Sequence, residues 1–392
     1  MEERYMNVRR RRSDYRDDPS PRRMATRRSA PSRQAPKPKR RSAAASVASG
    51  FYKALVIISA LIVAVYIGFS LMIKPPEQEQ PPQPPKNQAG NSLGPNFGTS
   101  SDTTNTVDPA VPAEPILNRR DGVYNILLAA TDKDGTRTDT MMVMCYDTVK
   151  QTVGVVSVPR DTITARESGH PKLAYGKGGV EQRVEDISQM LGIPIDGYIK
   201  VNIKGFITLV DYLGGIDFYV PCNMNYDDPV QDLHIHYKKG QQKLGGQQAM
   251  EVARFRKDNP DENGKSTGYS DVGRTDTQQK LLIALAKKVL SWDSLTKING
   301  FVEIFNKNVS TDLTLDNMMY FASQAINLDL SSSVETATLP GRGDGVYRGY
   351  KWCFELDPEG TLDAVNRFIN PYDRDLTLED MNLAKATHYI QG

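Results

Sequence analysis

The stretch VYNILLAATDKDGTRTDTMMVMCYD, residues 123–147, decides the fold. Its two ends, VYNILLAAT and MMVMCYD, are apolar runs with the length and aliphatic content of buried strands. The polar residues between them include three aspartates, an arginine and a lysine. The segment therefore predicts two strands of one sheet joined by a charged loop.

The charged loop has three possible interpretations. It begins DKDG, as a calcium-binding EF-hand loop does. However, Val143 stands at position twelve, where such a loop requires an acidic residue, and a strand instead of a helix precedes the loop. A hairpin turn with solvated charges is the simpler alternative. The positions of Asp132, at the end of one strand, and Asp139, at the start of the next, favour a site, because both carboxylates can meet at one sheet edge. Two carboxylates with substrate phosphates are the usual ligands of protein-bound magnesium.

The rest of the C-terminal part alternates between strand and helix patterns. QTVGVVSVPRD predicts a third strand, and GYIKVN, IDFYVP and ETATLP predict further ones. Helical spacing of apolar residues appears at 179–192, 203–215, 277–292, 299–308 and 315–328. Strands alternating with helices predict a layered α/β fold, and no linker interrupts residues 119–392, which we interpret as one domain.

The N-terminal part predicts a membrane anchor. Residues 54–73 carry no charge over 20 positions, and a helix of ~20 apolar residues spans the hydrocarbon layer of a bilayer. A secretory signal peptide has a short charged region and a cleavage site, whereas here the charged region exceeds fifty residues. We therefore predict a transmembrane helix at 51–74, followed by a Pro-rich extracellular linker at 75–118.

Charge is distributed unevenly along the chain. The net charge is +2 overall, but residues 1–50 hold 15 Lys or Arg against 5 Asp or Glu, a net of +10. This tail lacks large aliphatic residues and should be disordered and cytoplasmic, with the C-terminal domain outside the cell membrane. It should attract anionic lipid, with a cytoplasmic regulatory partner as the alternative. No folded nucleic-acid-binding module is visible in it, so nucleic acid is not an expected partner.

Arginine and aspartate recur at the ends of the predicted elements. A guanidinium group matches the geometry of phosphate oxygens, and alternate residues of an extended segment such as VARFRKD face the same side. These residues predict an anion site, with a surface salt bridge or buried ion-pair network as the structural alternative. The set comprises Arg160 and Asp161, Arg254 and Arg256, and Asp271 and Arg274.

Two other patterns are weaker. His234 and His236 share a strand face, but no third soft ligand is nearby, so we expect a polar strand edge rather than zinc, which takes three or four ligands. GRGD at 341–344 matches a cell-adhesion tripeptide, and we expect an ordinary loop there.

Three cysteines lie in the predicted external part. An odd number leaves at least one thiol free. A Cys222–Cys353 disulfide and a domain with free thiols remain alternatives, and Cys145 is expected to be a buried strand residue without chemistry.

In their order, these motifs resemble those of the LytR–CpsA–Psr family of cell-wall glycopolymer transferases over about residues 119–392. The resemblance is carried by NILLAATD with RTDTMMV, by VVSVPRDT, by LGIPIDGYIKVNIKGFITLVDYLGGIDFYVP, by GQQAMEVARFRKD and by GRTDTQQKLLIALAKK. The chain departs from the family pattern at Ala130, where glycine is usual, and at Thr277, where a second arginine is often found.

This resemblance implies a layered mixed β-sheet with flanking helices and an enzyme of the Gram-positive cell envelope. It implies transfer of a glycopolymer, such as teichoic acid or capsule, from a polyprenyl pyrophosphate carrier to peptidoglycan. A non-catalytic membrane-anchored regulator that binds a lipid-linked ligand is the alternative, and an adhesin using GRGD is a third.

The resemblance also implies roles for individual residues. Asp132 and Asp139 would hold magnesium, or alternatively manganese, on the pyrophosphate. The arginines Arg160, Arg254, Arg256 and Arg274 would clamp its oxygens. Apart from the resemblance, Asp161 is the expected general base because it neighbours Arg160 at the predicted site, with Asp139 or Asp271 as alternatives. Further substrate-binding residues would be Arg137, Lys172, Asp271 and Gln278.

Overall fold

The computed structural model of the chain describes residues 74–82, 117–132, 137–262, 264, 266, 269–291, 298–326 and 328–390, without the side chains of 270–272 and 298–302. The chain divides into two compact units, Met1–Ile67 and Gly68–Gly392, and every described residue belongs to the second. The predicted basic tail, 1–50, and the predicted membrane anchor, 51–74, except for Lys74, lie outside the described residues. Within the described part, no helix has the length and hydropathy needed to cross a bilayer.

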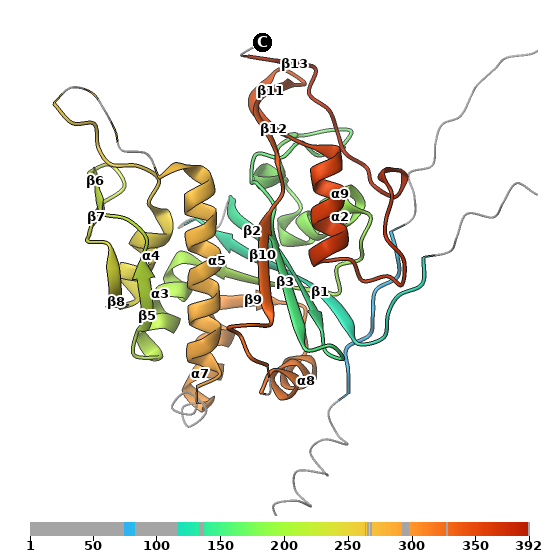
Figure 1. Cartoon of the computed structure of the whole chain (residues 1–392), viewed down its shortest axis with the longest axis horizontal. Helices are drawn as coiled ribbons and strands as arrows, with labels where there is room; N and C mark the ends of the chain where they lie inside the picture. The colour runs from blue at the N-terminus through green and yellow to red at the C-terminus, as the bar shows by residue number, and fades with distance from the viewer. Residues whose placement is uncertain are drawn as a thin grey trace, which may run out of the picture. The chain divides into compact units, whose positions relative to one another are not determined.

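A six-stranded mixed sheet forms the centre of the domain, with the strand order β10-β3-β2-β1-β4-β9 (Figure 1). The strands are β1 (Val123–Thr131), β2 (Thr138–Asp147), β3 (Thr152–Ser157), β4 (Gly197–Asn202), β9 (Val309–Thr311) and β10 (Val334–Thr338). β1 pairs antiparallel with β2 and parallel with β4, while β3 pairs parallel with β10. The predicted layered α/β fold with a mixed sheet is confirmed.

Helices cover both faces of this sheet (Figure 1). They are α2 (Gly179–Leu191), α3 (Ile203–Tyr212), α4 (Gly246–Arg254), α5 (Ser270–Val289), α7 (Ile298–Asn308), α8 (Leu315–Ala325) and α9 (Pro358–Phe368), with short 3-10 turns at Leu173–Tyr175 and Leu378–Asp380. One hydrophobic core joins the sheet to α2 and α9, and another joins the opposite face to α5 and α8. The five helices predicted from apolar spacing are all present; α5 begins seven residues before the predicted 277, at Ser270, and the other ends differ by three residues or fewer.

The alternation of side chains along β1 and β2 separates these two cores. Leu127 and Val143 pack into the core beside α2 and α9. Their neighbours Leu128 and Met142 point to the opposite face, because successive residues of a strand face opposite sides. That opposite face is the one that carries the cavity described below.

Two two-stranded sheets and a C-terminal sheet complete the domain. β5 (Ile216–Val220) pairs with β8 (Gly240–Leu244), and β6 (Met224–Asp228) pairs with β7 (Leu233–Tyr237). Both pack with α3, α4 and α5 around a separate core. β11 (Gly341–Tyr347), β12 (Tyr350–Leu356) and β13 (His388–Tyr389) form the third small sheet. The expectation that GRGD is a loop is wrong, because these residues begin β11 and pair with β12.

All three cysteines are free thiols. Cys145 is buried in β2, where desolvation raises its pKa to about 12, so it stays protonated and unreactive at neutral pH. Cys353 is also buried, and the alternative of a Cys222–Cys353 disulfide is not formed.

Part of the predicted Pro-rich linker contacts the domain. The side chain of Gln78 donates hydrogen bonds to the carbonyl oxygens of Arg120 and Val123 at 3.0 and 2.9 Å. The backbone N–H of Glu79 donates to Asp196. Residues 74–82 therefore run along the start of β1 rather than standing clear of the domain.

The contact between β3 and α9 requires a glycine. A Cβ atom at Gly154 would lie 1.8 Å from the carbonyl oxygen of Phe368, at the end of α9. We expect Gly154→Ala to lower the free energy of unfolding by about 1–3 kcal/mol, because a backbone atom has to move. Gly343→Ala is the matched control, since its Cβ would meet nothing closer than 3.5 Å. Urea denaturation of both variants checks the expectation, and equal stabilities would contradict it.

Candidate functional site

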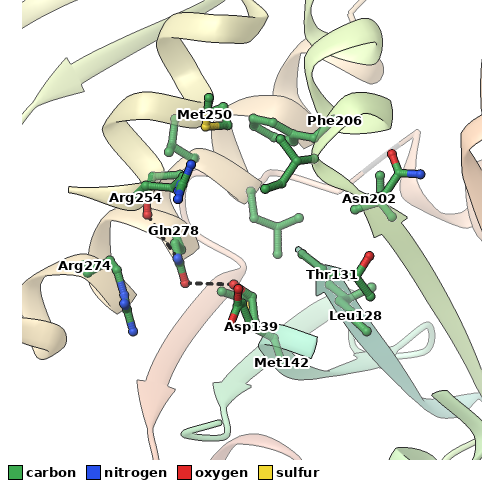
Figure 2. Close-up of a pocket in the computed structure, with 18 of the residues that line it drawn as sticks. Leu128, Thr131, Asp139, Met142, Asn202, Phe206, Met250, Arg254, Arg274 and Gln278 are labelled. Carbon is green, nitrogen blue, oxygen red and sulfur yellow. Dashed lines mark hydrogen bonds between the residues drawn. The ribbon is translucent and has the colours of Figure 1, made fainter. Parts of the chain in front are cut away.

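A cavity of about 610 Å³ lies between the central sheet and helices α3, α4 and α5 (Figure 2). Such a volume is typical of small-molecule sites. Most of its wall is apolar and comes from both the sheet and the helices. The apolar lining includes Leu128, Met142, Ile199, Val201, Ile203, Phe206, Leu209, Met250, Leu281, Leu282, Leu285 and Phe305.

One part of the wall is strongly cationic. Figure 2 shows Arg254, Arg274 and Gln278 on the helical side of the cavity, across from Asp139 on the sheet. Seven of the residues predicted from the sequence line this cavity, namely Arg137, Asp139, Arg160, Arg254, Arg256, Arg274 and Gln278. The structure therefore brings together residues that are separated by more than a hundred positions in the chain.

A β-bulge places Asp139 in the cavity. Ala130 pairs with Thr140 and Thr131 pairs with Thr138, so Asp139 is an extra residue on β2 without a partner on β1. Such a bulge redirects the side chain of the extra residue. The Asp139 side chain therefore does not follow the regular alternation of the strand, and its carboxylate contacts Arg137 and Arg160.

Two arginines hold the Asp139 carboxylate. Arg137 donates from Nε to Oδ1 at 2.6 Å and from Nη2 to Oδ2 at 3.0 Å. Arg160 donates from Nη1 to Oδ1 at 2.6 Å. Burial alone would raise the pKa of Asp139, but the hydrogen bonds and charges of Arg137 and Arg160 lower it below its ordinary value. Asp139 is therefore ionised at neutral pH, as a metal ligand or an ion-pair partner must be.

Asp132 lies directly after β1, on the other side of the hairpin. Its backbone N–H donates to the carbonyl oxygen of Arg137 at 3.0 Å, and its Oδ1 accepts from the backbone N–H of Arg137 at 3.3 Å. Both carboxylates thus belong to the same end of the β1–β2 hairpin, as the sequence predicted. Their hard oxygen donors suit magnesium, although both Asp139 oxygens already accept guanidinium N–H groups.

Asp161 and Lys172 lie beside the charged end without lining the cavity. Asp161 is 3.4 Å from Arg160 Nε, and its Oδ1 is 3.1 Å from Lys172 Nζ. Asp161 therefore contacts the arginine that reaches Asp139, and Lys172 contacts Asp161. Asp271 lies in the first turn of α5, but its side chain is outside the described residues.

The prediction that Arg254 and Arg256 lie on one extended segment is wrong. Arg254 belongs to the last turn of α4, not to an extended segment. It nevertheless lines the cavity with Arg256, and its Nη2 donates to Gln231 Oε1 at 2.6 Å. α4 ends at Arg254, because the next residue, the buried Phe255, adopts an extended backbone conformation.

Gln278 bridges the two walls of the cavity. Its Nε2 donates to the carbonyl oxygen of Ala253, and its Oε1 accepts from Thr140 on β2 at 3.3 Å (Figure 2). The preceding Thr277 is buried and donates to Tyr269, so the residue that replaces the expected arginine points into the protein.

Three residues that sequence reasoning missed belong to the site. Lys257 and Gln231 line the cavity. Tyr175 lies near Arg137, whose pKa is raised chiefly by its hydrogen bond to Asp139. Lys257 follows directly after RFR and could have been found as a third basic residue of that motif. Gln231 and Tyr175 carry no local signal, because their place depends on how distant segments pack.

The domain is thus a mixed α/β fold whose cavity joins an arginine cluster to an apolar wall. The sequence profile of the LytR_cpsA_psr family matches residues 95–365. The chain belongs to this family, as the order of motifs predicted.

Individual relatives agree with this assignment. The chain is 34% identical over 257 residues to a Bacillus anthracis protein named polyisoprenyl-teichoic acid–peptidoglycan teichoic acid transferase TagU, covering 64% of this chain and 79% of that protein. It is 31% identical over 251 residues to Bacillus subtilis TagV, a transferase of the same name, covering 62% and 61%. The crystal structure of B. subtilis TagV has a TM-score of 0.52 and 26% identity, covering 62% of this chain and 95% of that one.

Proposed function

We propose that this protein is a transferase that moves a glycopolymer of the teichoic-acid or capsule type from a polyprenyl pyrophosphate carrier to peptidoglycan. The observation that carries the proposal is the cavity, in which a cationic end continues into an apolar wall. A pyrophosphate joined to an isoprenoid chain has the same two-part character. The names of the relatives TagU and TagV, which describe teichoic acid transfer from a polyisoprenyl carrier to peptidoglycan, support it.

The arginines of the cavity would bind the pyrophosphate. Arg254, Arg256 and Arg274 come from the helical side and Arg160 from the end of β3, so guanidinium groups surround the charged end from two walls. In a largely apolar cavity such charges act more strongly than in water. They would stabilise the charge that develops on the phosphate oxygens in the transition state.

A magnesium or manganese ion would be held by Asp132 and Asp139. When bound, the ion neutralises phosphate charge and polarises the phosphorus centre. The contacts of Asp139 with Arg137 and Arg160 keep its carboxylate ionised and oriented. When the donor binds, its phosphate oxygens would give these arginines a second anionic partner.

The reaction is a phosphoryl transfer. The oxygen of a peptidoglycan hydroxyl attacks the phosphorus atom that bears the glycopolymer, the bond to the bridging oxygen breaks, and polyprenyl phosphate leaves. The hydroxyl proton passes to a base, for which we propose Asp161, because it contacts Arg160 at the charged end. Most of the catalysis would come from positioning and charge stabilisation, as phosphoryl transfer generally requires.

The proposal includes the location. The apolar segment 54–73 would anchor the chain in the cell membrane, with the basic tail in the cytoplasm and residues 119–392 outside. The tail would rest on anionic lipid of the inner leaflet.

Turnover of a defined donor tests the function. The purified full chain in detergent is incubated with a polyprenyl-pyrophosphate-linked glycopolymer, peptidoglycan fragments and magnesium, with and without chelator, and released polyprenyl phosphate is measured. Acceptor-dependent release that the chelator stops supports the proposal. Saturable donor binding without release in the presence of acceptor would favour the non-catalytic regulator, and no donor binding would refute both.

The metal role of Asp139 has its own test. We expect Asp139→Asn to raise the magnesium concentration for half-maximal turnover about tenfold or more, because an amide is a weaker ligand than a carboxylate. Asp344→Asn is a closely matched control, since Asp344 accepts the same two-pronged contact from Arg342, at 2.5 and 2.8 Å, outside the cavity. An unchanged magnesium dependence in Asp139→Asn would remove Asp139 from the metal site.

A further inference from the structure

The β6–β7 hairpin brings together three side chains that can ligate a metal. Asp227 pairs with His234 across the two strands, and His236 follows on the same face two residues later. The ligand atoms of the three side chains all lie within 4.8 Å of one another. No soft ligand stands beside the two histidines in this group, but strand pairing adds a carboxylate, Asp227, from the preceding strand, which the sequence reasoning did not include.

The contacts converge on one atom. His234 Nδ1 lies 2.6 Å from Asp227 Oδ1, and His236 Nε2 lies 3.1 Å from the same oxygen. Two imidazole nitrogens and one carboxylate oxygen thus lie close together on the exposed side of the hairpin. Three ligands of this kind with water in the fourth position form a common zinc site.

The environment of His236 suits a bound cation. Its Nδ1 lies 2.8 Å from Asn225 Oδ1, while its Nε2 faces Asp227. A neutral imidazole has a single N–H and can donate to just one of these two oxygens. With Nε2 bound to a metal, the Nδ1–H donates to Asn225, which is the usual way in which a second partner orients a metal-binding histidine.

We propose that Asp227, His234 and His236 form a surface site for a zinc-class divalent cation, with water completing the coordination. Mixed imidazole and carboxylate ligands favour zinc and related transition metals over magnesium, which prefers oxygen ligands alone. The site shares no residue with the carboxylates of the charged end, and it does not depend on the function proposed above.

A network without metal is the competing explanation. The hydrogen bond that His234 donates to Asp227 raises the pKa of His234, as it would in a simple histidine–carboxylate pair. Asp232 also approaches His234, with Oδ1 3.7 Å from Nε2. This explanation predicts that the hairpin has no particular affinity for zinc.

The position of the site links it to the cavity. The turn between β6 and β7 carries Gln231, which accepts a hydrogen bond from Arg254 and donates one to Asp228 at 2.5 Å. Tyr226 and Leu233, on the two strands of the same hairpin, also line the cavity. A cation held by both strands would cross-link β6 to β7 and reduce the motion of the turn that contacts Arg254.

Zinc titration tests the site directly. The full chain, purified with an affinity tag that contains no histidine and dialysed against chelator, is titrated with zinc chloride by calorimetry and with cobalt by visible absorption. We expect one saturable site whose dissociation constant rises at least about tenfold in His236→Gln and in Asp227→Asn. His388→Gln, which changes an exposed histidine on β13, should leave it unchanged.

Hydrogen exchange gives a second readout. Zinc should slow exchange in residues 224–237 of the unaltered chain and have no such effect in His236→Gln. Binding that persists in both hairpin variants, or no saturable binding at all, would overturn the proposal and leave a hydrogen-bonded histidine–aspartate network. Retained zinc binding in Asp139→Asn would separate this site from the proposed magnesium site.

Discussion

Arg160→Ala should reduce turnover of the lipid-linked donor by about 10³-fold or more while the domain stays folded. Arg160 reaches Asp139 at 2.6 Å and approaches Asp161 at 3.4 Å, so its guanidinium connects two carboxylates at the charged end of the cavity. Removing one preorganised donor to a developing oxyanion costs about 10²–10³ in rate, and removing an arginine that stabilises a phosphoryl transition state costs about 10³–10⁵. Steady-state release of polyprenyl phosphate, measured beside the thermal unfolding of each variant, checks this.

Two further variants sharpen this experiment. Arg160→Lys keeps the charge but loses the planar fork, so we expect it to recover little of the activity. Arg367→Ala is the matched control, because Arg367 is exposed and its ion pair with Glu335 is 3.6 Å long and remote from the cavity lining. If Arg160→Ala kept near-normal turnover, Arg160 would be a structural partner of Asp139, and the proposed clamp would lose the residue it depends on most.

Much of the fold was predictable because local patterns agree with the tertiary structure. The strands β1 and β2 are buried on both faces, so their sequences are nearly continuous apolar runs. Each run predicts a strand by itself, whatever elements pack against it. The apolar run of β1 ends before Asp132 and β2 begins at Thr138, and these two positions mark the edge of the sheet. The amphipathic spacing of α2, with Gly192 in the left-handed conformation after it, likewise defines a helix end.

The parts of the site that could not be predicted depend on pairing between distant segments. The β-bulge at Asp139 depends on the register of β1 and β2, and no residue type in the sequence predicts it. The ligand Asp227 meets His236 only when β6 pairs with β7. Arg254 lies in α4, although the stretch VARFRKD also fits an extended segment whose alternate residues face the same side.

The sequence of α3 does not show whether its apolar face packs in the core or lines the cavity. An apolar helix such as GFITLVDYL can line a groove or face a core. Val210 is fully buried in the core that α3 shares with β5 and β8, whereas Phe206 and Leu209 line the cavity (Figure 2). One helix therefore serves both purposes on adjacent faces, and substitutions on the cavity face can be separated from substitutions in the core.

Phe206→Asp should therefore weaken binding of a long-chain polyprenyl donor by about 10²-fold, which corresponds to roughly 3 kcal/mol. The lipid chain would have to lie against a carboxylate that loses its water without gaining a partner. A short, water-soluble pyrophosphate analogue reaches only the arginines, so its affinity should change little. Direct binding of both ligands to the full chain measures the difference between them.

Phe206→Leu separates polarity from fit in the same experiment. Leucine keeps the cavity wall apolar, so we expect most of the long-chain affinity to remain. Because Phe206 also packs partly against the core around α3, the thermal unfolding of each variant is needed to show that the domain is intact. An equal loss for long and short ligands in a folded Phe206→Asp variant would mean that the lipid chain lies elsewhere, and that the apolar wall binds some other part of the donor.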